Sequence, residues 1–590
     1  MPTSKVLDQP VHFANQALMG WLHRVPAAAD SAPKLGVVLC APFGYEAICA
    51  RRSLRAMATS FAAAGVPTLR FDYHGTGDSA GDDRDPQRVA VWQASIVAAI
   101  EELRASTGVQ AVALVGVRLG ALLAAQVAAA RDDIAAFVAI APVMNGKAYV
   151  RELRALQMAL GLSEPPAGLV WDKPAREAVG FAVTEETAAE LSTLTMLPER
   201  AVAPRVRVVD RSDLSIGDAW PNAQRNAGAD VTIQPFTGYA TMVLDPHKVV
   251  VPAGMINELT TWLVGLAPAA TPFVPAAPAD ARAINAVRFG APSSKFVEAP
   301  MQIAGRTSLF GVVTTPRAAK AQHAVLMLNA GAVHHVGPNR LYVALARRLA
   351  TAGVASLRMD IAGIGDSRAA NGIGENVVYP PTAVDDVLAA VTALRNQFQS
   401  VSVVGLCAGA YHGFKAAFAG AAVQRAVIIN PLTYFWAEGM SLDIELPDAR
   451  VVEAAKEYQA SMLSLAKWRK LLRGDVNVRK VAQIIGKRLA QRGQHAARDV
   501  ARRVGVRLGD DLGFEIASTT QRGVTLHFVF AKSDPGLAML REQGGAVVPQ
   551  LVRSGAISID VIDGPDHTFT ACWTHDVLLR KLEQLLTTAR

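Results

Sequence analysis

The pentapeptide GLCAG at residues 405–409 places a cysteine, Cys407, between two glycines with the spacing of a nucleophile elbow. The apolar run Val401 to Val404 predicts a strand before it, and the residues after it favour a helix. A nucleophile on such a strained turn needs small neighbours, and a helix N-terminus favours the reactive thiolate. The pattern predicts that Cys407 attacks a carbonyl carbon and forms a covalent acyl thioester. The alternative is a small buried core residue, which is what most free cysteines are.

Two segments near the C-terminus could supply an acid and a base for this nucleophile. Asp534 follows an apolar strand pattern in VTLHFVFAKSDPG, and His567 follows another in SIDVIDGPDHTF. Both are expected at the carboxyl edge of a parallel sheet, in the chain order nucleophile, acid, histidine. His567 would deprotonate Cys407 and later protonate the leaving group, while Asp534 would fix its tautomer. Asp563 and Asp566 are rival acids, but they lie too close in sequence to His567 to face its ring in the usual way.

An oxyanion formed at the attacked carbonyl needs two backbone N–H donors. The residue after the nucleophile, Ala408, would supply one of them. The loop after the strand pattern Ala324 to Leu328 would supply the other, most plausibly near Ala332. His334 and His335 of the same loop could contact substrate. One of them is equally well explained as a loop histidine whose hydrogen bonds are satisfied within the protein.

The sequence contains an internal repeat. AAAGVPTLRFDYHGTGDSAG at 62–81 returns as ATAGVASLRMDIAGIGDSRA at 350–369, a separation of 288 residues. ALVGVRLGALLAA at 113–125 returns as SVVGLCAGAYHGF at 402–414, a separation of 289. A drift of one residue over such distant landmarks indicates duplicated domains and not a shared short motif.

The D-x-x-G-x-G-D-S motif is present in both copies. Its members in the second copy look functional, but the motif is equally intact in the copy that lacks a nucleophile. The motif is therefore predicted to shape a turn. The residues concerned are Asp360, Gly363, Gly365 and Asp366.

Short Val, Leu and Ile runs alternate with helical segments in each copy, which is typical of a parallel sheet covered on both faces. We therefore predict an α/β fold with two tandem domains, each a mostly parallel sheet flanked by helices. The first spans residues 1–266, a Pro/Ala-rich linker spans 267–283, and the second spans 284–590. A helical cap is predicted within the second domain at about 434–521.

The first copy has lost the chemistry. Arg118 occupies the nucleophile position of its elbow, and arginine cannot attack a carbonyl because it stays protonated. Asp213 matches Asp534, but the segment Phe236 to Met242 contains no histidine where the second copy has His567. Arg118 could hold a carboxylate, phosphate or sulfate. The favoured alternative is that it pairs with a nearby acid such as Asp213.

These residues resemble the α/β-hydrolase superfamily, and within it the serine-aminopeptidase-like and lysophospholipase-like branch. The resemblance covers nearly all of both copies and includes the turn motif, the elbow and the late acid and histidine. The departure is Cys407 in place of serine. In this it is similar to dienelactone hydrolases, polyhydroxyalkanoate synthases and some carrier-protein aminoacyl shuttles. That similarity implies a thioester intermediate whose acyl group can be handed onward as well as hydrolysed.

The resemblance also implies that the insertion at about 434–521 is a cap over the site. Between Lys456 and Arg507 there are 14 Lys and Arg residues against three acids, although the whole chain carries only +8. Such a face is ordinarily a solvated one. A sharper reading is that it attracts an acidic partner: an acyl carrier protein, a coenzyme A thioester or anionic lipid headgroups. Aromatic residues are not interleaved as a nucleic-acid surface requires.

Four cysteines without a C-x-x-C pair suggest a reducing cytoplasm, and no apolar run is long enough for a membrane span. We therefore expect a soluble cytoplasmic protein that needs no metal or other cofactor and does not insert into membranes. The predicted function is hydrolysis of a small-molecule ester or thioester through Cys407, His567 and Asp534. The alternatives are an acyltransferase that moves an acyl group from a carrier protein or coenzyme A to an acceptor, and a non-catalytic binding protein.

Overall fold

The computed structural model describes residues 6–15, 17–25, 34–196, 200–266, 294–318, 320–437, 439–440, 442 and 507–587. The predicted linker at 267–283 and most of the predicted basic cap lie outside these residues. The described chain forms two compact units. The first comprises residues 1–321, 331–378 and 569–590, and the second comprises residues 322–330 and 379–568.

The first sheet has eight strands, all in the first unit. Its order is β1-β2-β4-β3-β5-β6-β9-β10; β2 pairs antiparallel with β1 and with β4, and all other neighbours pair parallel. A separate short hairpin is formed by β7 and β8. The bounds are β1 Leu7–Phe13, β2 Leu18–Arg24, β3 Leu35–Cys40, β4 Thr68–Phe71, β5 Ala111–Val117, β6 Ile134–Ile140, β7 Arg176–Ala178, β8 Phe181–Val183, β9 Arg205–Arg211 and β10 Asp230–Phe236.

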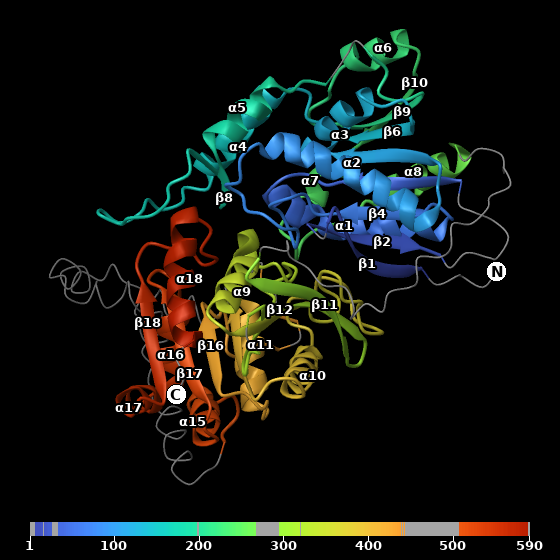
Figure 1. Ribbon diagram of the computed structural model, residues 1–590. Coiled ribbons are helices and arrows are strands. Elements are labelled where there is room, and N and C mark those ends of the chain that lie inside the picture. Colours follow the sequence, from blue (N-terminus) through green and yellow to red (C-terminus); the bar gives the residue numbers. More distant parts are fainter. Residues whose placement is uncertain are drawn as a thin grey trace, which may run out of the picture. The chain divides into compact units, whose positions relative to one another are not determined.

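Helices cover both faces of this sheet (Figure 1). Alternate residues of β5 point to opposite faces, so Leu114 packs with Trp92 and Leu122, whereas Val115 packs with Phe61 and Leu259. Helices α2 and α3 therefore bury one face, and α1 and α8 the other. The bounds are α1 Tyr45–Ala63, α2 Arg88–Thr107, α3 Leu119–Ala129, α4 Gly146–Ala159, α5 Glu185–Thr193, α6 Ala219–Asn226, α7 Tyr239–Met242 and α8 Ala253–Leu266.

The second sheet also has eight strands in the same order, which confirms the predicted α/β fold class with two mostly parallel sheets flanked by helices. The first unit holds β11 Phe296–Ala304, β12 Ser308–Pro316, β14 Ala355–Met359, the 3₁₀ helix η2 Pro338–Arg340, α9 Leu341–Thr351 and α18 Cys572–Thr587. The second unit holds β13 His323–Leu328, β15 Ser400–Leu406, β16 Arg425–Ile429, β17 Thr525–Ala531, β18 Ile557–Ile562, α10 Ala383–Arg395, α11 Ala408–Phe418, α15 Leu512–Gln521, α16 Gly536–Gly544 and α17 Val547–Arg553. Among the described helices, none is long and apolar enough to cross a membrane.

The repeated D-x-x-G-x-G-D-S motif forms the same turn twice, as predicted. In the first copy a carboxylate oxygen of Asp72 accepts from the backbone N–H of Asp78 at 3.0 Å. In the second copy Asp360 accepts from the N–H of Asp366 at 3.0 Å. A serine hydroxyl then donates to the backbone carbonyl of the first aspartate in each copy. The first aspartate of the motif is thus a structural acceptor.

Gly365 tests how tightly this turn is built. Its φ is +55°, and a Cβ there would lie 2.3 Å from Oδ2 of Asp360. We expect Gly365→Ala to cost about 1–3 kcal/mol of unfolding free energy, measured from urea midpoints. Gly353→Ala is the matched control, since Gly353 has φ +87° but no atom within 4 Å of the added methyl group. Equal midpoints for the two variants would contradict this account of the turn.

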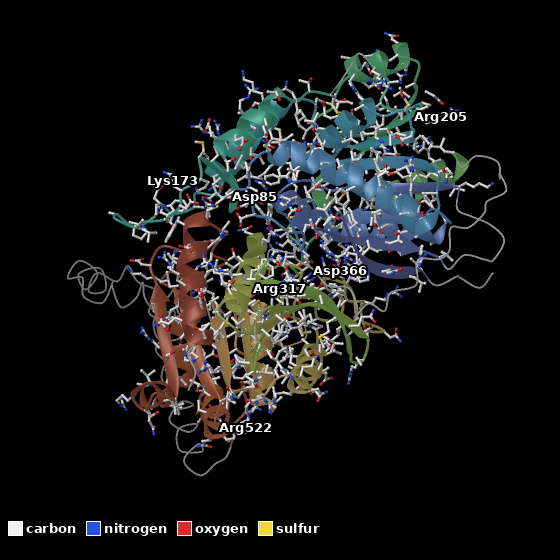
Figure 2. All side chains as sticks on the ribbon, in the orientation of Figure 1. Asp85, Lys173, Arg205, Arg317, Asp366 and Arg522 are labelled. Atoms are coloured by element: carbon white, nitrogen blue, oxygen red, sulfur yellow. The ribbon has the colours of Figure 1, made fainter. Side chains whose placement is uncertain are left out.

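Two equivalent arginines exchange aspartates inside the first unit. Arg358 of β14 donates to Oδ1 of Asp78 at 2.5 Å, and Arg70 of β4 donates to Asp366, which is labelled in Figure 2. Arg358 follows Arg70 by 288 residues and Asp366 follows Asp78 by the same number, so the two pairs are related by the repeat. Both ring nitrogens of His335 lie at hydrogen-bond distance from carboxylates: Nε2 is 2.7 Å from Asp78, and Nδ1 is 2.7 Å from Asp360. These charges are almost wholly buried.

An apolar cluster of Met19, Trp21, Phe310 and Val312 accompanies the exchanged pairs. The rings of Trp21 and Phe310 meet edge to face with centroids 4.6 Å apart. The registers of β2 on β4 and of β12 on β14 make Met19 equivalent to Phe310 and Trp21 equivalent to Val312. The two repeats therefore contribute equivalent positions to one cluster, which is the pattern of a self-complementary interface.

Candidate active site

Cys407 occupies the predicted elbow between β15 and α11. It has φ 59° and ψ −117°, and its N–H donates to the carbonyl oxygen of Ile429 at 2.9 Å. Arg118, at the same place in the first copy, has φ 53° and ψ −120°. A positive φ in a non-glycine residue costs about 1–3 kcal/mol and persists only where the surroundings impose it. Both copies therefore build the same strained strand-to-helix turn.

The glycines of the elbow are required by space. A Cβ on Gly405 would lie 2.1 Å from the carbonyl carbon of Gly409. A Cβ on Gly409 would lie 2.7 Å from the carbonyl oxygens of Leu328 and Asn329. The spacing read from the sequence thus reflects close contact between the first turn of α11 and the strands beside it.

His567 and Asp534 meet in the second unit. Nδ1 of His567 lies 2.6 Å from Oδ2 of Asp534, whose carboxylate is buried and accepts a second hydrogen bond from the N–H of Gly536 at 2.9 Å. This pairing fixes the imidazole with its other nitrogen, Nε2, facing away from the acid. Nε2 is buried, and the side chain that interacts with it is Cys407. This nitrogen is available to exchange a proton.

The rival acids point elsewhere. The carboxylate of Asp563 pairs with Lys532 at 2.8 Å on the exposed surface. Asp566 accepts from the hydroxyl of Thr568 at 3.2 Å. The acid on the imidazole is therefore Asp534, as chain order predicted.

The electrostatics of His567 involve Cys407 directly. Burial opposes a charge on the imidazole, but the charge and hydrogen bonding of Cys407, together with Asp534, outweigh it and raise the pKa of His567 to about 10. An imidazole that keeps its proton beside the sulfur is placed to act as a general acid. The arrangement can supply a nucleophile and an acid at neutral pH.

Asn430 is a positioning residue that the sequence analysis missed. It follows β16 with φ 43°, and its amide donates to the carbonyl oxygen of His567 at 2.7 Å. The amide oxygen accepts from the N–H of Ala531 at 2.8 Å, so one side chain ties the histidine loop to the end of β17. Ala141 holds the equivalent place in the first copy with φ 45°. Asparagine after a strand, where the first copy has alanine, was the only available signal.

Tyr379 is a second residue that the sequence did not indicate. Its ring stacks on Trp436 with centroids 4.3 Å apart and meets Tyr411 edge to face. The hydroxyl is buried without a hydrogen-bond partner among the described residues. Burial and the charge of Cys407 raise the pKa of Tyr379 well above its usual value. It remains a neutral hydrogen-bond donor close to the sulfur.

The predicted oxyanion donors lie on two different segments. Ala408 is the first residue of α11 and is fully buried. Ala332 is buried in the loop after β13 and belongs to the first unit. Of the two histidines in that loop, His335 has both ring nitrogens on carboxylates, so it is the satisfied loop histidine and offers no free nitrogen to a substrate. His334 is also buried, and burial lowers its pKa well below the usual value.

Arg118 is held by acids, as the favoured alternative predicted, but the acids are different. Its Nε donates to Glu46 at 2.8 Å and its Nη2 donates to Glu152. The predicted partner Asp213 is wrong: it is largely exposed and pairs with its near neighbour Arg211 at 2.9 Å. The Nε and Nη2 edge of Arg118 is thus already occupied by two carboxylates.

One set of side chains in the first unit has the spacing of a cation site. Ligand atoms of His335, Asp360 and Asp366 lie within 4.8 Å of one another. Asp366 already pairs with Arg51 and Arg70, and His335 lies between two carboxylates. The positive charge that a metal ion would bring is thus supplied by side chains.

Asp534→Asn should preserve the shape of the acid but lose the charge that orients and stabilises the imidazolium. We expect it to lower kcat for ester or thioester hydrolysis by about 10³–10⁴-fold. The matched control is Asp563→Asn, whose carboxylate pairs with an exposed lysine and should leave the rate within twofold of the parent, or about 0.4 kcal/mol. Similar rates for Asp534→Asn and the parent enzyme would remove Asp534 from the mechanism.

Comparisons with known proteins give one family match and several distantly similar structures. Residues 34–171 match the family described as serine aminopeptidase, S33, so the match lies wholly within the first copy. A comparison with curated proteins finds no match. Similar solved structures include brefeldin A esterase, described as a bacterial homologue of human hormone sensitive lipase, with 15% identity, 52% of this chain and 80% of that chain covered and a TM-score of 0.30. Others are Est1E from Butyrivibrio proteoclasticus with bound ferulic acid, with 16% identity, 43% and 100% covered and a TM-score of 0.32, and hypothetical protein PA2218 from Pseudomonas aeruginosa, with 17% identity, 44% and 95% covered and a TM-score of 0.32.

The family match covers part of the first copy, and both sheets have the same mostly parallel strand order. The matched stretch contains the elbow with Arg118, which cannot act as a nucleophile. Any hydrolase chemistry of this chain therefore depends on the second copy.

Proposed function

We propose that this protein is a hydrolase of the α/β type that cleaves an ester or thioester through a covalent thioester on Cys407. The observation that carries the proposal is the His567–Asp534 pair, which interacts with a cysteine held at an elbow of the same unit. A buried core cysteine would not require the positive φ, the two glycines and a raised histidine pKa together.

In the proposed first step the thiolate of Cys407 attacks the carbonyl carbon of the substrate, and the carbonyl oxygen becomes an oxyanion. The N–H group of Ala408, the residue after the nucleophile, stabilises that oxyanion. The protonated Nε2 of His567 gives its proton to the departing alkoxide or thiolate as the bond to the carbonyl carbon breaks. The products are a free alcohol or thiol and an acyl group on the sulfur of Cys407.

The second step reverses the roles. Nε2 of His567, now neutral, takes a proton from water while the water oxygen attacks the thioester carbonyl. Collapse of the tetrahedral intermediate breaks the bond to sulfur and releases a carboxylic acid. The thiolate of Cys407 and the imidazolium of His567 are restored.

Acyl transfer is the second candidate, and the sulfur at position 407 is the feature that favours it. A thioester keeps its acyl group activated toward an acceptor alcohol, amine or sugar. Acyl carrier proteins and coenzyme A thioesters are the donors considered, because the basic segment between Lys456 and Arg507 would attract acidic partners. That segment lies outside the described residues.

Product analysis with the full-length chain separates the candidates. A panel of aryl esters and acyl thioesters is incubated with and without an excess of glycerol, glucose or a primary amine, and products are identified by mass spectrometry. Hydrolysis predicts free acid as the main product in every mixture, at a rate independent of the acceptor. Acylated acceptor as the main product would replace hydrolysis by transfer, and turnover of no substrate would refute both.

A further inference from the structure

A large cavity among the described residues lies in the first unit, and Cys407 does not line it. Its volume is about 540 Å³, which is in the range that holds small organic ligands. The wall is formed by β2, β4, the start of α1, the loops after β3 and β4, and parts of α9 and α18. Its apolar part includes Trp21, Phe43, Ile48, Leu54, Tyr73 and Phe181.

Arg88 contributes an unusual group to this wall. It begins α2 and its side chain is fully buried. Its Nη1 donates to the carbonyl oxygens of Asp83 at 2.8 Å and Ala182 at 3.1 Å. Within the described ranges, Nε and Nη2 are buried without any hydrogen-bond partner. Two buried N–H donors of a charged group without acceptors cost free energy. Their presence in a cavity wall therefore indicates that a bound ligand supplies the acceptor.

The unpartnered edge of Arg88 has a definite specificity. Nε and Nη2 are the two parallel donors with which a guanidinium grips a carboxylate. Arg347, in the same cavity wall, uses this edge on Glu298, with distances of 3.2 and 2.8 Å. Arg211 uses it on both oxygens of Asp213. On Arg88, by comparison, the same edge has no carboxylate bound to it.

The guanidinium of Arg88 is held in place before any ligand arrives. Its carbon lies 4.6 Å from the ring centroid of Trp92 and 5.5 Å from that of Phe43. Phe43 in turn contacts Phe181, with centroids 6.0 Å apart. A side chain fixed between rings loses little further freedom on binding, which favours affinity.

The other charges of the wall are already matched. Arg51 and Arg70 pair with Asp366, and further arginines pair with their own acids: Arg84 with Asp172, Arg347 with Glu298 and Arg348 with Asp576. No ion pair involves Arg88 or Arg340 in the part of the chain that the structure describes. Arg340 instead donates to the backbone carbonyls of Gly77, Ser79 and Gly81.

The acids closest to Arg88 are Asp83 and Asp82. Burial and the neighbouring Asp82 raise the pKa of Asp83 to about 6, so this carboxyl can take up a proton when a further anion enters. Asp83 also accepts from the N–H of Ala182 at 2.9 Å, which keeps it on the loop. The part of the cavity beside Asp83 can therefore accept a ligand with a negative charge.

We propose that this cavity binds a small organic carboxylate, whose two oxygens accept from Nε and Nη2 of Arg88 and whose apolar body lies against Phe43 and Phe181. Neither Cys407 nor His567 lines the cavity, so the site is separate from the proposed catalytic one and does not rest on the proposed function. The first copy, which has lost the nucleophile, would retain a ligand-binding role at a place other than its elbow.

The test is calorimetric titration of the full-length Cys407→Ala protein with benzoate, phenylacetate and octanoate, with phenylacetamide as the uncharged match of phenylacetate. We expect at least one carboxylate to bind with a sub-millimolar Kd and the amide to bind at least about tenfold more weakly. Arg88→Lys keeps the charge but removes the fork, and should weaken binding about tenfold or more. Arg84→Lys is the matched control in the same wall and should bind like the parent.

A second variant guards against misfolding of Arg88→Lys. Ala47→Phe, from α1, places a ring in the cavity without touching Arg88 chemistry, and it should abolish binding while the circular dichroism spectrum is retained. The proposal is overturned if no carboxylate binds at about 10 mM, ten times the upper limit expected for Kd. It is also overturned if the amide binds as tightly as the acid, or if folded Ala47→Phe binds like the parent.

Discussion

Cys407→Ala is expected to lower kcat for ester or thioester hydrolysis by about 10⁴–10⁶-fold, the loss typical of removing a nucleophile from a working triad. The methyl group cannot attack a carbonyl, while the elbow, the pairing of His567 with Asp534 and the substrate contacts remain. The circular dichroism spectrum and the urea midpoint should therefore match those of the parent. Initial rates on the best substrate of the panel measure the effect.

Cys49→Ala is the matched control for this substitution. Cys49 is equally a buried free cysteine, but it belongs to α1 in the first copy. Its replacement should leave kcat within about threefold, or about 0.65 kcal/mol, of the parent. If Cys407→Ala retains parental activity on substrates that the protein turns over, then the nucleophile is another group and the proposed mechanism fails.

Asp78→Asn should destabilise the first unit by about 3–5 kcal/mol, because it removes one partner of a buried charge network. Asp78 is 3% exposed, and its two oxygens are held by Arg358 at 2.5 Å and His335 at 2.7 Å. The neutral amide leaves a buried guanidinium and a buried imidazolium without their shared counter-charge. Urea unfolding followed by tryptophan fluorescence measures the loss.

Asp85→Asn is the control for this second prediction. Asp85 also pairs with a histidine, His74 at 2.8 Å, but the pair is partly exposed and should be worth less than about 1 kcal/mol. The double variant Asp78→Asn/Arg358→Met should recover part of the stability lost by Asp78→Asn, since the buried guanidinium that keeps only Glu298 as a partner is then removed. A midpoint of Asp78→Asn equal to that of Asp85→Asn would contradict the importance of the exchanged pairs.

The same network gives the protein a defined pH response. Burial opposes a charge on His335, but Asp78 and Asp360 outweigh it and raise the pKa of His335 to about 10, against about 6.5 in an unfolded chain. The stabilisation is complete below the unfolded value and is lost as pH rises toward 10. Stability of the parent should therefore fall between pH 7 and 10, and in Asp78→Asn this dependence should be smaller.

The features that could be predicted from the sequence were those formed by residues close to one another in the chain. The repeat, the elbow around Cys407 and the order of Asp534 and His567 each depend on a strand followed by a turn, and hydrophobic patterning locates such strands. The same local character let the D-x-x-G-x-G-D-S motif be assigned to a turn, because Asp360 accepts from an N–H only six residues away.

What sequence could not supply were contacts between distant segments. Arg118 was expected to pair with Asp213, because Asp213 matches Asp534 when the two copies are aligned. In the structure Arg118 instead donates to Glu46, at the start of α1. Asn430 contacts His567 and Ala531, each of which lies more than 100 residues away in the sequence. The contacts of His335 could not be predicted either, because the carboxylate of Asp78 lies 257 residues away in the sequence.

The most direct test of the central claim is intact-mass measurement after the full-length protein is mixed with acetyl and octanoyl thioesters of N-acetylcysteamine and quenched in acid. The account predicts a single added acyl group that maps to the peptide containing Cys407, is absent from Cys407→Ala and forms more slowly in His567→Ala. An acyl group on Cys40, Cys49 or Cys572 instead, or no adduct with any thioester that the protein consumes, would contradict it.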